Sequence, residues 1–315
     1  MKHHGSTGIL ATLLLSLFFA GGCEARQESV GRSGAGAAAT HRSSIDAAMM
    51  PERASVSDED YAEYVLKLQQ KLADQGYTVR LEKPFVVVGN EDADTVQKRC
   101  EQTIRWAVTR LKKQYFPNDP DHIIEIWLFG DKETYDKGCE ALIGRAPTTP
   151  FGFYSASEKK LIMNIATGGG TLVHEIVHPF MAANFPECPS WFNEGLASLY
   201  EQSGSKDDRI VGYTNWRLRG LQLAVEDDRL PPFETMLKTT TREFYDDPSG
   251  TNYAQARYLC YYLQESGKLA DFYNEFHKNA VDDPSGIETL QSILETDDLP
   301  GFQASWKEWV SKLRF

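Results

Sequence analysis

The segment TLVHEIVHPF at residues 171–180 constrains this chain more than any other, because it holds two histidines four positions apart. On a helix such positions lie one above the other, so His174 and His178 would present their imidazoles to a single ion. Glu175 is rotated by about 100° from His174, where its carboxylate can reach a water on that ion without being a ligand. The rest of the segment is mostly apolar, so we expect a buried helix whose imidazoles need polar partners or a metal.

The two ends of this helix can be placed from the neighbouring residues. Gly168 to Gly170 form a flexible approach, and the hydroxyl of Thr171 is a candidate N-cap. Pro179 removes the N–H that would bond to the carbonyl of Glu175, but the residues after it remain compatible with a helix. We therefore expect a bend at the proline and not the end of the helix.

A zinc ion with a catalytic water takes three protein ligands and leaves one position open, so a third ligand is expected near the histidines. In the metzincin pattern H-E-x-x-H-x-x-G-x-x-H, the glycine and the last histidine would fall on Met181 and Asn184, which excludes that family. The segment PSWFNEGLASLYE at 189–201 predicts a second helix instead, with Glu194 after fifteen intervening residues from His178. The loop between the helices can reverse the chain and bring this carboxylate beside the imidazoles.

Two glutamates compete for the role of third ligand. Glu194 lies on the predicted second helix, which Ser190 can cap. Glu187 is a rival on distance alone, but it lies in a proline-rich loop with no helical support. We therefore predict one Zn²⁺ ion held by the two histidines and Glu194, with Glu175 as the general base.

The combination of HEIVH with W-F-N-E-G-L-A further along resembles the gluzincin metallopeptidases, in particular the peptidase MA-like domains, in which a W-x-x-E-G-x-A helix carries the glutamate. The similarity covers roughly residues 78 to 275. The gap before Glu194 is shorter than in aminopeptidase-type gluzincins. The resemblance implies a zincin-like fold and zinc-dependent hydrolysis of peptides or proteins, and it places an oxyanion-stabilising tyrosine at Tyr253, the first residue of YAQARYLCYYL.

Three further features have two interpretations each. Tyr253 can be catalytic, or it can be a packing residue among the tyrosines that crowd the same helix. Arg257 can meet a substrate carboxylate, or it can be an ordinary exposed arginine. The run from Leu161 to Ile165 can be an edge strand that pairs with a substrate backbone, or a buried structural strand.

The first part of the chain is a targeting segment. An apolar run of twelve residues, Ile9 to Ala20, is too short to span a bilayer and predicts a signal peptide over residues 1–22. Small residues before Cys23 resemble a bacterial lipobox, which implies that Cys23 is lipidated; a plain secretory signal is the alternative. Residues 23–56, rich in Gly, Ala, Ser and Arg, predict a flexible tether. We thus expect an exported, membrane-anchored lipoprotein on the periplasmic or cell-surface side.

Residues 57–189 alternate helix and strand signals, whereas strand signals fade beyond residue 190. The early part contains an extended segment at 78–90, a long amphipathic helix at 92–116 and a hairpin around SASEKK. The later part predicts helices at 213–226, 253–266, 268–279, 285–295 and 302–313. The sequence therefore predicts an α+β, two-lobed fold, with a mixed sheet and helices in a subdomain at 57–189 and a mostly helical subdomain at 190–315.

The net charge of −12 is spread along the chain, which argues against nucleic acid as a partner. Four cysteines follow Cys23, and export permits disulfides, but the sequence does not choose among their pairings. Cys100, Cys139 and Cys260 fall on apolar faces of predicted helices and can be buried free thiols, whereas Cys188 lies in a loop. The sequence leaves the oligomeric state open.

Two alternatives to a peptidase are consistent with the same motif. A catalytically inactive zinc-fold lipoprotein could bind or scaffold other molecules, but an intact Glu175 argues against it, because loss of that glutamate is the simplest way to disable such a site. A structural helix with no metal would leave the histidines, Glu175 and Glu194 without a joint explanation.

Overall fold

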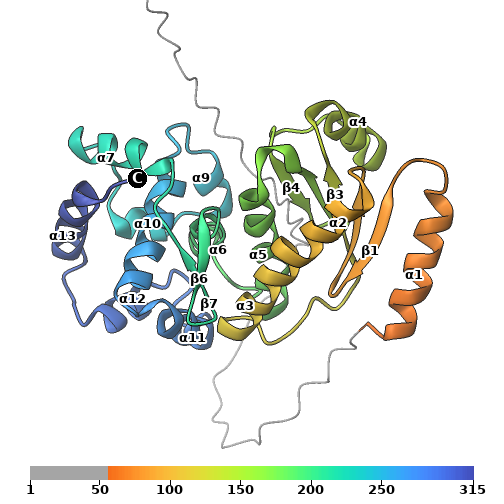
Figure 1. Cartoon of the computed structure of the whole chain (residues 1–315). Coiled ribbons are helices and arrows are strands. Elements are labelled where there is room, and N and C mark those ends of the chain that lie inside the picture. The colour runs from red at the N-terminus through yellow and green to blue at the C-terminus, as the bar shows by residue number, and fades with distance from the viewer. Residues whose placement is uncertain (1–55) are drawn as a thin grey trace, which may run out of the picture.

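The computed structural model of the chain describes residues 56–315 (Figure 1). The predicted signal peptide at 1–22, Cys23 and all but the last residue of the predicted tether at 23–56 lie outside the described residues. The described part has an α+β fold, as expected, with a mixed sheet and many helices. None of the helices described combines the length and the apolarity that a membrane crossing requires.

A five-stranded mixed sheet belongs to the first half of the described chain. Its strands are β1 (Thr78–Glu82), β2 (Phe85–Gly89), β3 (Ile124–Phe129), β4 (Gly152–Ser155) and β5 (Lys160–Asn164). In space their order is β1-β2-β3-β5-β4; β2, β3 and β5 are parallel, and the edge strands β1 and β4 are antiparallel to them. The extended segment expected at 78–90 is therefore two paired strands, while the expected hairpin around SASEKK is confirmed.

The run from Leu161 to Ile165 is not an edge strand. It forms most of β5, which lies between β3 and β4, and Leu161 faces Ile126 on one side and Tyr154 on the other. All residues of β5 after Lys160 are buried. The buried interpretation is therefore confirmed, and the edge on this side of the sheet belongs to β4.

Helices cover both faces of the sheet. They include α1 (Asp58–Lys71), α2 (Ala93–Arg99), α3 (Trp106–Gln114) and α4 (Lys132–Ile143). Side chains of β2 alternate between two cores, because successive residues of a strand point to opposite faces: Val87 lies in the larger core, and Val88 lies in the smaller core that α1 and α4 cover. The helix expected at 92–116 is formed, with a π-helical turn at Cys100–Arg105 that joins α2 to α3.

The chain after the sheet is mostly helical. It comprises the 3₁₀ turn η2 (Ile165–Thr167), α5 (Gly169–Asn184), α6 (Ser190–Leu199), β6 (Ser203–Lys206), β7 (Arg209–Gly212), α7 (Arg217–Glu226), α8 (Phe233–Leu237), α9 (Thr241–Tyr245), α10 (Thr251–Glu265), α11 (Leu269–Asn279), α12 (Ile287–Leu294) and α13 (Leu299–Lys312). Every helix expected in this part is present. The β6–β7 hairpin contradicts the expectation that strands fade beyond residue 190; each strand has only four residues, and β6, SGSK, contains no apolar residue.

The larger hydrophobic core is continuous from the sheet to the last helix. It includes Phe85 of β2, Ile176 of α5 and Trp306 of α13. In Figure 1 the sheet lies on the right, the later helices lie on the left, and α5 and α6 lie between them. Close approach of α6 to α10 depends on Gly195, where an added Cβ would lie 2.9 Å from the Sγ of Cys260. The subdomain boundary after residue 189 and the two-lobed arrangement stay predictions.

Arg257 takes neither of the positions expected for it. Its side chain is fully buried, and it donates from Nε to the carbonyl of Ser198 at 3.0 Å and from Nη2 to the carbonyl of Tyr213. The carbonyls at the end of a helix have no partner within the helix, so this guanidinium caps the end of α6. Both expectations, a contact with substrate and an exposed position, are wrong.

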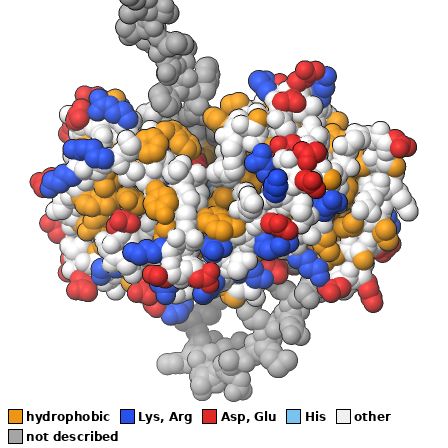
Figure 2. Space-filling model, viewed as in Figure 1, with side chains coloured by type: hydrophobic (Ala, Val, Ile, Leu, Met, Phe, Trp, Pro, Cys, Tyr) orange, Lys and Arg blue, Asp and Glu red, His pale blue; other side chains and the backbone are white. Residues whose placement is uncertain are grey.

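The cysteines and the surface agree with ordinary globular packing. Cys100, Cys139, Cys188 and Cys260 are all free, and all of them except the half-buried Cys188 are buried, as expected. On the face drawn in Figure 2, acidic and basic side chains of the described residues are interspersed with small apolar areas.

Candidate metal centre

The helix α5 presents the predicted metal ligands. It begins at Gly169, earlier than expected, because Gly168 has a φ of 112°, a conformation that glycine allows, and serves as its N-cap. The prediction of Thr171 as N-cap is therefore wrong. The helix continues through Pro179 to Asn184, so the proline does not end it, as expected.

The helix α6 follows after a short loop and supplies the predicted carboxylate. Its N-cap residue is Pro189, so the prediction that Ser190 caps it is wrong; the Ser190 hydroxyl instead lies 3.1 Å from the Oγ1 of Thr241. Glu194 lies in the middle of α6 and is fully buried. The rival Glu187 is exposed in the loop.

The structure brings the predicted ligands together. The Nε2 of His174 lies 3.2 Å from the Oε2 of Glu194, and the Nε2 of His178 lies 3.8 Å from the Oε1 of the same carboxylate. One donor atom from each of these buried residues can be chosen so that all lie within 4.8 Å of one another. This group could bind a metal ion.

Two polar atoms of the cluster support this interpretation. The Nε2 of His178 and the Oε2 of Glu194 are buried and meet no hydrogen-bond partner among the described residues. Buried polar atoms without a partner are costly and uncommon in folded proteins. Imidazole nitrogen and carboxylate oxygen are ligands that divalent transition metals accept, so the unpaired atoms fit a bound cation.

The charges of the cluster are strongly coupled. Burial lowers the pKa of His174, but Glu194 and the nearby Glu201 outweigh burial and raise it above its usual value. Burial raises the pKa of Glu194, but His178 and His174, together with a hydrogen bond from Tyr245, outweigh it and lower the pKa below its usual value. A positive charge among these groups is therefore favoured, and a metal ion would supply one.

Each histidine is supported on its far side by a second polar group. The Nδ1 of His178 lies 3.0 Å from the Oδ1 of Asn193, and the Nδ1 of His174 lies 3.3 Å from the Oε1 of Glu201. The second contact is electrostatic, because the His174 Nδ1 makes no hydrogen bond of good geometry among the described residues. Such outer partners fix the ring orientation of metal-binding histidines.

Glu201 is held in place from several directions. It accepts hydrogen bonds from the Nε and Nη2 of Arg217, at 3.2 and 2.8 Å, and from the Nδ2 of Asn215 at 3.0 Å. Burial raises its pKa, but Arg217 and His174 outweigh burial and lower the pKa to about 2. The start of α5 touches its backbone, since a Cβ added to Gly170 would lie 2.1 Å from the carbonyl oxygen of Glu201.

Glu175, the predicted general base, lies beside the cluster. Its buried Oε2 is 3.9 Å from the Nε2 of His178, and it accepts a hydrogen bond of 2.9 Å from the backbone N–H of Tyr154 on β4. Burial raises the pKa of Glu175 above its usual value, although the two histidines oppose this effect. The carboxylate is thus oriented by the edge strand of the sheet.

Two tyrosines of the helical part come near the cluster. The hydroxyl of Tyr245 donates a hydrogen bond of 2.6 Å to the Oε1 of Glu194. The ring of the predicted Tyr253 lies 6.1 Å from the ring of Tyr245, and the guanidinium of Arg217 is 5.5 Å from its centre. The structure therefore brings Tyr253 to the surroundings of the site, and its catalytic role stays a prediction.

Several supporting residues were missed from the sequence. Asn193 directly precedes Glu194, and Glu201 lies just past the end of α6, so both are close to Glu194 in the sequence. Arg217, Asn215 and Tyr245 carried no local signal, because they reach the site from segments distant in the sequence.

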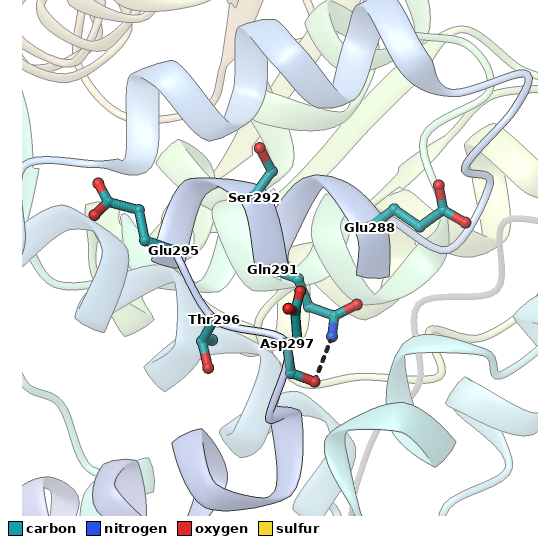
Figure 3. A pocket seen from close by; sticks show the side chains of 6 residues that line it. All are labelled: Glu288, Gln291, Ser292, Glu295, Thr296 and Asp297. Atoms are coloured by element: carbon teal, nitrogen blue, oxygen red, sulfur yellow. Dashed lines mark hydrogen bonds between the residues drawn. The ribbon is translucent and has the colours of Figure 1, made fainter.

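A surface hollow, lined by none of the predicted ligands, lies along α12 and the turn that follows it (Figure 3). It is lined by Glu288, Gln291, Ser292, Glu295, Thr296 and Asp297. None of these residues belongs to the metal cluster, and exposed acidic groups are common without an ion.

No protein-family model matches the chain, and no curated protein matches it.

Proposed function

We propose that this chain is an exported zinc-dependent metallopeptidase of the gluzincin type. The observation that carries this proposal is the convergence of two imidazoles and one carboxylate from neighbouring helices, in which buried atoms of His178 and Glu194 have no hydrogen-bond partner among the described residues. A buried glutamate, Glu175, lies beside them and is not needed as a ligand.

Zinc is the ion that this ligand set favours. Two neutral imidazoles and one carboxylate leave one tetrahedral position open, as in catalytic zinc sites. A zinc ion bound there would polarise a substrate carbonyl and lower the pKa of a water molecule toward ~7. His174, His178 and Glu194 would hold it, and Asn193 and Glu201 would orient the two rings.

Glu175 is the residue that we assign to proton transfer. Its carboxylate accepts a proton from the attacking water and passes it to the leaving amine. Burial raises its pKa, which brings its basicity closer to what a base working near neutral pH requires. The hydrogen bond from the Tyr154 backbone holds one oxygen of this carboxylate in place.

The peptide substrate is assigned to the edge strand β4. An exposed strand edge can pair with an extended peptide, and β4 is the edge nearest to Glu175 because Tyr154 contacts it directly. Tyr253, by the resemblance to gluzincins, would donate to the developing oxyanion from the helical side. Lipidation of Cys23 would hold the enzyme at a membrane on the periplasmic or cell-surface side.

Metal analysis combined with peptide hydrolysis tests this function. We expect wild-type protein to bind one zinc ion per chain and to cleave members of a mixed peptide library. Glu175→Gln should retain zinc and lose activity by about 10²–10⁴-fold, because only proton transfer is removed. Glu187→Gln is the matched control, since this exposed glutamate lies close in sequence and outside the cluster.

Each other outcome has a distinct meaning. Zinc binding without hydrolysis by the wild type would favour a zinc-fold binding or scaffold lipoprotein. Absence of zinc from the wild type, even after addition of the ion, would remove the metal site itself and the peptidase with it.

A further inference from the structure

We infer, on the basis of the proposed function, that Tyr245 is a positioning residue that restricts Glu194 to binding the metal through one oxygen, Oε2. The two oxygens of this carboxylate have different surroundings. Oε1 accepts a hydrogen bond of 2.6 Å from the Tyr245 hydroxyl, whereas Oε2 is buried without a hydrogen-bond partner among the described residues and lies 3.2 Å from the Nε2 of His174. The carboxylate therefore has one oxygen held by Tyr245 from outside the cluster and one that faces His174, another predicted ligand.

The hydrogen bond from Tyr245 is of the strong kind. A hydroxyl that donates to an ionised carboxylate forms short bonds, typically about 2.5–2.7 Å, and such bonds are roughly twice as strong as neutral ones. Glu194 is fully buried, so no water competes for Oε1 as it would at the surface. Rotation of the carboxylate would break this bond.

The helix α9, which carries Tyr245, is itself fixed against α6. Its first turn is closed by a capping box in which Thr240 and Glu243 bond to each other's backbone. The hydroxyls of Thr241 and Ser190 lie 3.1 Å apart and join the start of α9 to the start of α6. The helix that carries Tyr245 is thus attached to α6, the helix that carries Glu194.

A single oxygen ligand matters for the chemistry. A carboxylate can bind a cation through one oxygen or both, and binding through both would fill the position that a catalytic site keeps open. By occupying Oε1, Tyr245 keeps that position available. Its effect is exerted through Glu194, so it is distinct from the role predicted for Tyr253.

The test compares Tyr245→Phe with Tyr262→Phe. The first change removes one oxygen and keeps the ring, which packs on Phe244 at 5.7 Å and on Tyr253 at 6.1 Å. The second makes the same change on α10, where the ring packs on Phe302 and Trp309 and does not touch the cluster. Thermal unfolding in the presence of a chelator shows whether both variants fold.

Two measurements report on the metal itself. We expect Tyr245→Phe to weaken zinc binding about 10-fold in competition with a chromophoric chelator, and Tyr262→Phe to leave it unchanged. Substitution of Co²⁺ for zinc should give a visible spectrum that changes in Tyr245→Phe and not in Tyr262→Phe, because coordination number alters the absorption. Loss of activity should then follow from a lower kcat.

Two results would overturn this role of Tyr245. One is equal zinc affinity and an equal cobalt spectrum in wild type, Tyr245→Phe and Tyr262→Phe. The other, independent of any variant, is a crystal structure of the zinc-loaded wild type in which both oxygens of Glu194 bind the ion. Either would leave the zinc peptidase intact, whereas a wild type that binds no zinc would overturn the proposed function first.

Discussion

Two buried glutamates in this molecule have opposite surroundings. Glu125, at the start of β3, accepts hydrogen bonds of 2.5 Å on each oxygen, from the Tyr64 hydroxyl and from the Nε1 of Trp127, and the Nζ of Lys160 lies 3.7 Å away. Glu194 has one oxygen bonded to Tyr245 and one without a hydrogen-bond partner among the described residues. Both side chains are almost completely excluded from solvent.

The difference separates a carboxylate with a structural role from one that could bind a metal ion. Burial of a charge is costly in either place, and the protein offsets that cost at Glu125 with its own donors and a lysine. At Glu194, one carboxylate oxygen and the Nε2 of the neighbouring His178 have no hydrogen-bond partner among the described residues. Incomplete pairing, and not burial, is therefore the feature that points to a metal.

The largest effect that would test the contrast between Glu194 and Glu125 is the stabilisation of the protein by zinc. At a free zinc concentration about 1,000 times the dissociation constant, the wild type should gain about 4 kcal/mol of unfolding free energy. Glu194→Ala should lose nearly all of this gain, because a ligand is removed. Denaturant unfolding with zinc and with chelator measures both values.

A matched substitution checks that the gain comes from this site. Glu187→Ala removes an exposed glutamate that lies close to Glu194 in sequence and outside the cluster, and it should keep the full response. If Glu194→Ala gained as much from zinc as the wild type, the ion would bind elsewhere and the contrast with Glu125 would have no functional meaning.

A smaller effect is expected at the other carboxylate. Glu125→Gln should lower the unfolding free energy by about 1–3 kcal/mol, because an amide NH₂ would then face a donor and leave it unpaired. The gain in unfolding free energy on addition of zinc should be the same as in the wild type. The same unfolding curves measure it, and a changed zinc response would show that the two clusters are coupled.

The smallest effect concerns the support of His174. Gly170→Ala should weaken zinc binding about 10-fold, because the new Cβ would lie 2.1 Å from the carbonyl oxygen of Glu201 and displace that residue from His174. Chelator competition measures the affinity.

The control for Gly170 lies in α7. An added Cβ on Gly220 would meet no atom within 4 Å. Gly220→Ala should therefore raise the unfolding free energy by up to about 1 kcal/mol and leave zinc affinity unchanged. Equal affinities in the two alanine variants would contradict the role given to the contact between Gly170 and Glu201.

The metal cluster could be predicted from the sequence because its geometry is local. The spacing of His174 and His178 places two rings on one helix face whatever the rest of the fold does. Glu194 needed only a reversal of the chain through a short loop. The supporting residues Arg217 and Tyr245 could not be predicted, because a long-range contact leaves no periodic trace in either segment.

For the fold, too, local features could be predicted from the sequence and long-range contacts could not. The long helices and the β4–β5 hairpin follow from apolar periodicity, and they are found where expected. The order of the strands does not follow from it, so the sequence left open whether Leu161 to Ile165 is an edge or a buried strand, and the structure puts β4 at the edge. Both interpretations of Arg257 missed its buried position, because arginine is rarely buried and the carbonyls it caps at the end of α6 belong to another segment.

The continuous core has a practical consequence for anyone who wishes to dissect this protein. A cut after residue 189 would part the histidines from Glu194, and it would also divide a cluster of apolar side chains that runs from Phe85 to Val310. Each piece would expose the apolar surface that it buries against the other piece in the intact protein. Neither half, expressed alone or fused to another protein, is therefore expected to fold with a complete metal site.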